Sequence, residues 1–244
     1  PTTVILSKKG WTRAAKGHDL NPDTLNYKSG DSYLDSMKLR SNQQVIFLDS
    51  LGRTYSLSAH TLPSARSQGE PLTGRFNPPQ GAKFVSVFGG EPDSWWLVAS
   101  DAGYGFCLQS KDALANKKGG KAMLSLSKGA FALRPSLISD FDTDRVVAVT
   151  TEGRMLVISI SDIPILTKGK GNKIIGIPSK RILDRSEFMV DVIVVPLKNK
   201  LRIISGKRHL TLNAKDLDHY EGERGRRGNK LPRGFQKVDR LELD

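Results

Sequence analysis

The sequence predicts an all-β protein made of five repeated units, each of about fifty residues. Two observations lead to this prediction. First, five segments share one pattern, which is an apolar strand, a short turn ending in glycine, and a second apolar strand. Second, the turn glycines follow one another at intervals of 42, 51, 50 and 53 residues, and they are Gly10, Gly52, Gly103, Gly153 and Gly206.

Each of the five segments is expected to form a β-hairpin. Valine, isoleucine, leucine and aromatic residues dominate the flanks, and glycine can take the positive φ that a tight turn demands. The segments are VILSKKGWTRAA, IFLDSLGRTYSL, LVASDAGYGFCL, VAVTTEGRMLVI and LRIISGKRHLTL. The middle three align without a gap, the last has a turn one residue shorter, and the first is the least regular.

A glycine-containing, mostly basic loop is expected roughly one hairpin length after each turn glycine. The five loops, in order, are AAKGHD, ARSQGEP, NKKGGKA, KGKGNKI and ERGRRGN. The last three lead into further apolar strands near Met123, Ile174 and, less clearly, Lys230. A fifty-residue unit with several strands is typical of a blade in a propeller-like fold, although a sandwich or barrel without a true repeat remains an alternative. We therefore predict one domain over residues 1–244, with repeats at about 1–43, 44–95, 96–144, 145–198 and 199–244.

The charge of the chain indicates a polyanionic partner. Lysine and arginine number 38 against 25 aspartate and glutamate, which gives a net charge of +13 and a pI near 9.9. From Lys198 to Arg240 there are 13 basic and five acidic residues, a net of +8. This concentration favours nucleic acid binding over general solubility as the reason for the charge.

The basic loops fit the backbone of a nucleic acid better than a bound nucleotide. KGKGNKI lacks the spacing of a phosphate-binding loop, its Ser or Thr and its following helix. Glycines could expose N–H groups to an anion, and lysine and arginine release counterions from phosphodiesters. Repeated around a perimeter, the loops would form a curved track that bends duplex DNA without reading its sequence. The candidate contacts are Arg13, Lys16, Arg53, Arg66, Lys117, Lys118, Lys121, Arg154, Lys168, Lys170, Lys173, Lys207, Arg208, Arg224, Arg226, Arg227 and Lys230.

Catalytic and metal-binding patterns find little support. The histidines are scattered without ligand spacing, and no serine stands in a GxSxG turn. Cys107 is expected to be a buried small hydrophobe, and as the single cysteine it favours a reducing compartment. Trp11, Trp95 and Trp96 are expected to anchor the core. We find no signal peptide or membrane-spanning run, and a start at Pro1 suggests a processed chain or an excised domain.

Several stretches together resemble the C-terminal domain of bacterial type IIA topoisomerase A subunits, in the topoisomerase IV (ParC) branch. They are VILSKKGWTRAAKGHDL, TLPSARSQGEPLTG, ASDAGYGF, KGKGNKIIGIPS and GERGRRG, and the resemblance runs along the whole chain in order. It implies a five-bladed β-pinwheel whose blades exchange strands with their neighbours. It also implies a domain that binds and bends DNA along its basic outer rim and presents a transported segment to the remainder of the parent protein.

The departures from the family pattern sharpen this expectation. The glutamine-arginine-arginine-glycine-glycine-lysine-glycine box of gyrase is matched neither by NKKGGKA nor by ERGRRGN, and the chain ends at LELD without an acidic tail. This favours topoisomerase IV over gyrase. No tyrosine follows an arginine, as the family's catalytic tyrosine does, so this chain alone is expected not to be an enzyme.

The resemblance also supplies expectations about partners. No cofactor is expected in this domain, and ATP and Mg²⁺ would act elsewhere in the parent enzyme. The implied partners are double-stranded DNA, the homodimer formed by the remainder of the ParC chain, and the ATPase partner protein ParE, in the bacterial cytoplasm at the nucleoid. Three alternatives stay open: a DNA-wrapping gyrase domain, a propeller-type module for an acidic protein, and a hydrolase assembled across blades.

Overall fold

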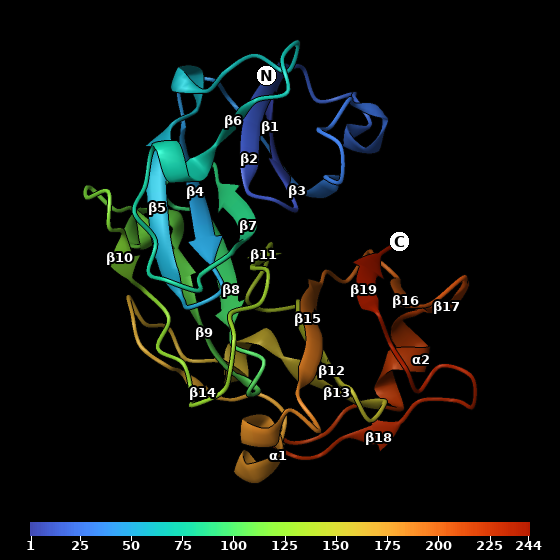
Figure 1. The fold of residues 1–244 in the computed structure, drawn as a ribbon. Coiled ribbons are helices and arrows are strands. Elements are labelled where there is room, and N and C mark those ends of the chain that lie inside the picture. Colours follow the sequence, from blue (N-terminus) through green and yellow to red (C-terminus); the bar gives the residue numbers. More distant parts are fainter. The chain divides into compact units, whose positions relative to one another are not determined.

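The structure is a computed structural model that describes all residues, Pro1–Asp244. It contains five small antiparallel sheets, which are drawn in chain order from blue to red in Figure 1. Contacts divide the chain into two compact units. Unit 1 consists of Pro1–Ser94 and Gln109–Ser125, and unit 2 of Trp95–Leu108 and Leu126–Asp244. The prediction of a single domain stays a prediction.

Unit 1 holds two four-stranded sheets, which we call blades 1 and 2. Blade 1 has the strand order β3-β1-β2-β6 and blade 2 the order β10-β5-β4-β7. The strands are β1 (Thr2–Ser7), β2 (Trp11–Lys16), β3 (Tyr33–Leu39), β4 (Gln44–Asp49), β5 (Arg53–Ser58), β6 (Glu70–Pro71), β7 (Phe84–Gly89) and β10 (Lys121–Ala122). Short 3-10 helices lie at Pro22–Thr24, Ala59–Thr61, Leu72–Gly74 and Ser110–Ala113.

Unit 2 holds three sheets, blades 3 to 5. Their strand orders are β11-β8-β9-β14, β15-β12-β13-β18 and β17-β16-β19. The strands are β8 (Trp95–Ala99), β9 (Tyr104–Gln109), β11 (Ser136–Ile138), β12 (Arg145–Thr150), β13 (Arg154–Ser159), β14 (Asn172–Lys173), β15 (Met189–Val195), β16 (Leu201–Ser205), β17 (Arg208–Leu212), β18 (Asn229–Lys230) and β19 (Arg240–Leu243). The helices are α1 (Ser179–Asp184), α2 (Ala214–Asp218) and a 3-10 turn at Ile160–Asp162, and no helix is long and apolar enough to cross a membrane.

The central pair of strands in each blade is one of the five predicted hairpins, namely β1–β2, β4–β5, β8–β9, β12–β13 and β16–β17. All five turn glycines have positive φ, between +60° at Gly206 and +91° at Gly52. At Gly52 the need for glycine is also steric, because a Cβ there would collide with the carbonyl of Leu124. The glycine spacing therefore identified the hairpins correctly.

Each of the first four blades takes its outermost strand from the next repeat. The two-residue strands β6, β10, β14 and β18 pair with β2, β5, β9 and β13, which belong to the preceding hairpins. Blade 5 has three strands, and no such strand pairs with β17. Five sheets linked by exchanged strands confirm the predicted all-β, five-bladed pinwheel fold.

The residue after each exchanged strand secures the exchange. It is Leu72, Met123, Ile174 or Leu231, and each is at most 2% exposed. Its N–H donates to the carbonyl of the preceding turn glycine, at 2.9 Å from Leu72 to Gly10 and 2.6 Å from Ile174 to Gly103. Burial of a large aliphatic side chain favours the folded state by about 1.5–3 kcal/mol, so these residues hold the ends of the loops before them.

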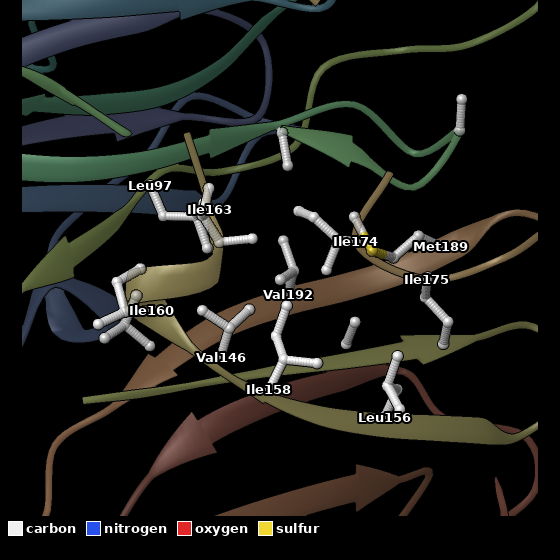
Figure 2. Close-up of a cluster of buried hydrophobic side chains, with 14 of the residues drawn as sticks. Leu97, Val146, Leu156, Ile158, Ile160, Ile163, Ile174, Ile175, Met189 and Val192 are labelled. Carbon is white, nitrogen blue, oxygen red and sulfur yellow. The ribbon is translucent and has the colours of Figure 1, made fainter. Parts of the chain in front are cut away.

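The cores lie within the units. In unit 1, Val4, Val45, Phe47 and Tyr55 pack against one another. In unit 2, one cluster packs around β12, β13 and β15 and includes Ile174 and Ile175 from the segment after β14, as Figure 2 shows. A second cluster packs around β16. The apolar residues that follow a basic loop are thus core residues, but they lie just after the two-residue strands and do not form the apolar strands that the sequence pattern predicted near Met123 and Ile174.

One expected loop is not the counterpart of the others. AAKGHD was aligned with the later basic loops, but Ala14–Lys16 lie inside β2, and the Gly17 carbonyl accepts the hydroxyl of Thr3 in the same blade. The physical reason is spacing. Gly17 follows its turn glycine by 7 residues, whereas the last glycines of the later basic loops follow theirs by 17 to 22, so AAKGHD falls at the end of the hairpin strand itself.

Candidate nucleic-acid interface

The segments that lead into the exchanged strands form four loops, at residues 64–69, 115–120, 165–171 and 221–228, which we call exchange loops. Three of them start at a parallel bridge to a hairpin strand, namely Ser64 to Ala14, Ile165 to Cys107 and Glu221 to Val157. In the remaining loop, the N–H of Ala115 donates to the Ser56 hydroxyl at 2.8 Å. Each loop is therefore tied down at its start and at its end.

The last glycine of each exchange loop has a packing role. Gly69, Gly120, Gly171 and Gly228 have φ between +75° and +88°. A Cβ on Gly171 would collide with the carbonyl of Gly105 on β9, and the other three meet strand carbonyls in the same way. We expected the loop glycines to bring the backbone close to phosphates. The structure corrects this for these four positions, because their missing Cβ lets the loop cross a strand.

In unit 1, the 64–69 loop and the end of β2 line a groove of about 920 Å³. Lys16 and Arg66 both face this groove and are exposed. The remaining lining residues are mostly alanine and serine. Small side chains between two cations suit the close approach of a polyanionic backbone.

The other predicted contacts of unit 1 divide into free and engaged cations. Lys117 and Lys118 are exposed on the 115–120 loop. The Lys121 ammonium donates to the carbonyl of Asp112. The Arg53 guanidinium donates to the carbonyls of Gly119 at 2.9 Å and Gly120 at 3.1 Å.

Arg13 requires a correction. It is 3% exposed, and its guanidinium donates to the carbonyls of Ser67 and Asn26, each at 2.7 Å. It also lies 4.8 Å from the centre of the Tyr27 ring. Arg13 therefore has no surface to offer a phosphate, and its role is to hold two segments of blade 1 together.

In unit 2, the 221–228 exchange loop lies beside β14 and the segment that follows it. The Gly176 N–H donates to the Arg226 carbonyl at 2.9 Å, and the Gly225 N–H donates to the Ile174 carbonyl at 2.8 Å. The Arg224 guanidinium adds a bond of 2.8 Å to the Lys173 carbonyl. This arrangement brings together most of the predicted contacts of unit 2. The exposed cations on the 165–171 and 221–228 loops and the strands after them are Lys168, Lys170, Lys173, Arg224, Arg226 and Lys230.

Two arginines of this region mainly support the loops. Arg154 donates to the Gly228 carbonyl at 3.2 Å. Arg227 donates to the Gly176 carbonyl at 2.6 Å and makes two bonds, of 2.9 and 2.8 Å, to the carboxylate of Glu187. Glu187 is fully buried and also accepts from Arg181 at 3.0 Å. Burial alone would raise the pKa of Glu187, but the bonds from Arg227, Arg181 and Thr150 outweigh it and hold the pKa below 4.5.

The last two predicted contacts lie outside the exchange loops. Lys207 and Arg208 are exposed at the β16–β17 turn of blade 5, where no exchanged strand pairs.

Sequence reasoning also missed two cations. Lys28 lies over the ring of Trp11, and Lys128 lines a cavity of about 190 Å³ together with Tyr104 and Lys170. Lys128 is followed by glycine, the same pattern as in the basic loops, so the sequence could have indicated it. No neighbouring residue distinguishes Lys28 in this way.

The remaining chemistry of the chain is structural. No three or more His, Cys, Asp and Glu residues are placed to hold a metal ion. Cys107 is buried, as predicted, and burial raises the pKa of its thiol to about 12. Trp96 is buried, while Trp95 packs at 5.2 Å edge-on against Phe141. Trp11 is only half-buried, so it is less of a core residue than expected.

Known proteins match this fold along the whole chain. A family described as "DNA gyrase C-terminal domain, beta-propeller" matches residues 144–196. The solved structure of the E. coli ParC C-terminal domain superposes with a TM-score of 0.87 at 45% identity, covering 100% of this chain and 98% of that one. The chain belongs to the family of ParC C-terminal domains. The resemblance seen in the sequence is thus confirmed.

The chain also matches one part of longer relatives. The A subunit of DNA topoisomerase 4 from Pseudomonas aeruginosa is 54% identical, and that from Escherichia coli K12 is 46% identical, each over all 244 residues. The chain spans 32% of the length of either relative. A gyrase A C-terminal domain, at 15% identity and a TM-score of 0.69 over 97% of this chain and 80% of that one, shares the fold.

Proposed function

We propose that this chain binds and bends duplex DNA without reading its sequence, as the C-terminal domain of a topoisomerase IV ParC protein. The observation that carries the proposal is the pair of basic loops in unit 2. Backbone bonds join residues 174–176, which follow β14, to residues 225–226 of the 221–228 loop, and six lysines and arginines remain exposed on the two loops and on β14 and β18. Arg226 pairs with Glu223 and Arg224 binds the Lys173 carbonyl, while the exposed lysines are available to phosphodiester oxygens.

The secondary structure supports contact with the backbone rather than with base edges. Recognition of bases in the major groove usually uses a helix or a two-stranded ribbon. Here α1 has six residues and α2 five. The exposed cations instead lie on loops and on two-residue strands, where they can follow phosphates of any sequence.

In the parent enzyme, we propose that this domain steers the choice of the transported DNA segment during decatenation and relaxation. The names of the relatives and the length they have beyond this chain support that role. On this proposal the cleaving tyrosine, Mg²⁺ and ATP act in other parts of the protein. The isolated domain is not an enzyme and needs no cofactor. Its partners are DNA, the remainder of the ParC homodimer and the ATPase protein ParE, in the bacterial cytoplasm.

The test compares two variants with the same loss of charge. In one, Lys168, Lys170 and Lys173 are changed to glutamine; in the other, the exposed lysines Lys38, Lys198 and Lys215 are changed instead. Affinity for a long linear duplex is measured across a series of salt concentrations. Each lost phosphate contact should reduce the slope of log K against log salt by about 0.9, so the clustered variant should lose up to about 2.7.

The outcomes separate the alternatives. The dispersed variant should lose much less, and equal losses would mean that the loop contributes only general charge. Absence of duplex binding by the wild-type chain at low salt would refute the DNA proposal. Wrapping is measured by resealing a nicked circle with the domain bound. A shift in linking number would report wrapping and its sign, as in a gyrase-like domain, and no shift would exclude net wrapping.

A further inference from the structure

One position in each of the first four blades faces the exchanged strand at the same register. It pairs with the second residue of that strand, and the pairs are Trp11 with Pro71, Arg53 with Ala122, Tyr104 with Lys173 and Arg154 with Lys230. The residue type alternates along the chain. Blades 1 and 3 have an aromatic side chain at this position, whereas blades 2 and 4 have arginine.

In blades 2 and 4 the arginine side chain binds backbone carbonyls of the protein. Arg53 binds the carbonyls of Gly119 and Gly120, and Arg154 binds that of Gly228. Each acceptor belongs to the exchange loop that crosses the same blade. A guanidinium is a rigid planar fork, so its bonds to loop carbonyls orient the whole group toward the loop.

In blades 1 and 3 a lysine ammonium group lies over the face of the aromatic ring. The Lys28 ammonium lies 3.9 Å from the centre of the Trp11 ring. The Lys170 ammonium lies 4.1 Å, and the Lys173 ammonium 5.9 Å, from the centre of the Tyr104 ring. No hydrogen bond or ion pair of these three ammonium groups with the protein is recorded in the structure. A ring covers one side of an ammonium and restrains the long side chain, while N–H donors still face outward.

We propose that Lys28 on Trp11 and Lys170 on Tyr104 are equivalent phosphate-binding sites for DNA, and that Arg53 and Arg154 only position the loops. The proposal rests on the proposed DNA-binding function and adds a contact, Lys28, that lies outside every exchange loop. The physical basis is preorganisation. An unrestrained lysine loses rotamer entropy when it grips a phosphate, whereas a lysine held on a ring has lost part of that freedom already.

The first experiment is the salt dependence of duplex binding by single variants. Lys28→Gln and Lys170→Gln should each reduce the slope by about 0.9. The controls Lys38→Gln and Lys215→Gln remove exposed lysines without an aromatic partner and should leave the slope unchanged. Arg53→Gln and Arg154→Gln should also leave the slope unchanged but should lower the Tm by a few degrees, because loop hydrogen bonds are lost.

The second experiment varies the ring. Tyr104→Phe keeps the aromatic face and should bind like the wild type. Tyr104→Leu should weaken binding by about two- to fivefold at fixed salt, the order of an exposed cation–π interaction. Tyr104→Arg makes blade 3 resemble blades 2 and 4. It adds a positive charge, yet it should not steepen the slope, because the new guanidinium faces loop carbonyls.

A third measurement uses the unmodified chain and so does not depend on the folding of any variant. Lysine acetylation is followed by mass spectrometry with and without duplex DNA. DNA should protect Lys28 and Lys170 and leave Lys38 and Lys215 reactive. If the wild type binds no DNA at low salt, the proposed function itself fails. Two results would overturn this inference while DNA binding stands. In the first, the wild type binds DNA, but Lys28 and Lys170 are not protected and their substitution leaves the slope of log K against log salt unchanged. In the second, Arg53→Gln reduces that slope as much as Lys28→Gln and Lys170→Gln do.

Discussion

Replacing Glu187 by glutamine tests how the two basic loops of unit 2 are held. The Glu187 carboxylate is fully buried. It accepts two hydrogen bonds from Arg227 and one from Arg181. Arg227 also binds the carbonyl of Gly176 at 2.6 Å. The substitution keeps the shape of the side chain but removes the charge that pairs with both arginines.

The expected cost follows from the exposure of the partners. Breaking a fully buried ion pair costs about 3–5 kcal/mol. The arginine side chains here are 35% and 50% exposed, so water compensates part of the loss. We therefore expect a loss of about 2–3 kcal/mol in the free energy of unfolding. An unpaired arginine that is hydrated destabilises the fold less than an unpaired arginine that is fully buried. Glu152→Gln, at an exposed carboxylate in the β12–β13 turn, is the control and should cost nothing measurable.

Urea unfolding at several pH values provides the assay. The folded-state pKa of Glu187 lies below its ordinary value of 4.5, so its charge contributes stability above that value and loses it as the pH falls through the folded pKa. The difference in stability between wild type and Glu187→Gln should therefore be full at pH 7 and shrink below about pH 4.5. A difference that stays constant down to pH 3 would refute the charge-pairing explanation.

Three further predictions concern packing and reactivity. Gly171→Ala should lower the free energy of unfolding by more than Gly206→Ala, because both glycines have positive φ but only Gly171 packs against a strand carbonyl. The cost of the left-handed backbone alone is about 1–2 kcal/mol. Equal losses of stability in urea melts would contradict the packing role of Gly171. Ile174→Ala should cost about 2–5 kcal/mol and also weaken DNA binding through the 165–171 loop, whereas a loss of stability with unchanged affinity would separate loop and core. The Cys107 thiol, whose pKa burial raises to about 12, should react with a thiol reagent at pH 8 only at the rate of unfolding, and rapid reaction of the folded chain would contradict its burial.

The hairpins and their core strands were predictable because their signals are local. A turn glycine takes positive φ, and the apolar residues that flank Gly52 and Gly153 pair within a few residues of the turn. Their regular spacing made the repeat visible without coordinates. The alignment failed only at AAKGHD, where the hairpin strand itself ends in lysine and glycine.

The division of the cations into free and engaged groups was not predictable in this way. Arg53 and Lys117 look alike in the sequence, but the acceptors of Arg53 lie 66 and 67 residues further along the chain. Arg154 likewise reaches an acceptor 74 residues away. Lys28 has no local mark at all, because its partner Trp11 belongs to the preceding strand.

The sequence by itself determined the number of repeats, the position of each turn and the family, because these depend on residue type and on spacing along the chain. Only the tertiary structure decided what each glycine and arginine does. A glycine followed by a basic residue is compatible with an exposed phosphate loop and with a loop packed across a strand. Strand exchange selects the second for Gly171 and Gly228, because it brings a carbonyl from the preceding hairpin to the place where a Cβ would stand. The same exchange supplies carbonyls that bind Arg53 and Arg154, and it places the Lys170 ammonium over the ring of Tyr104.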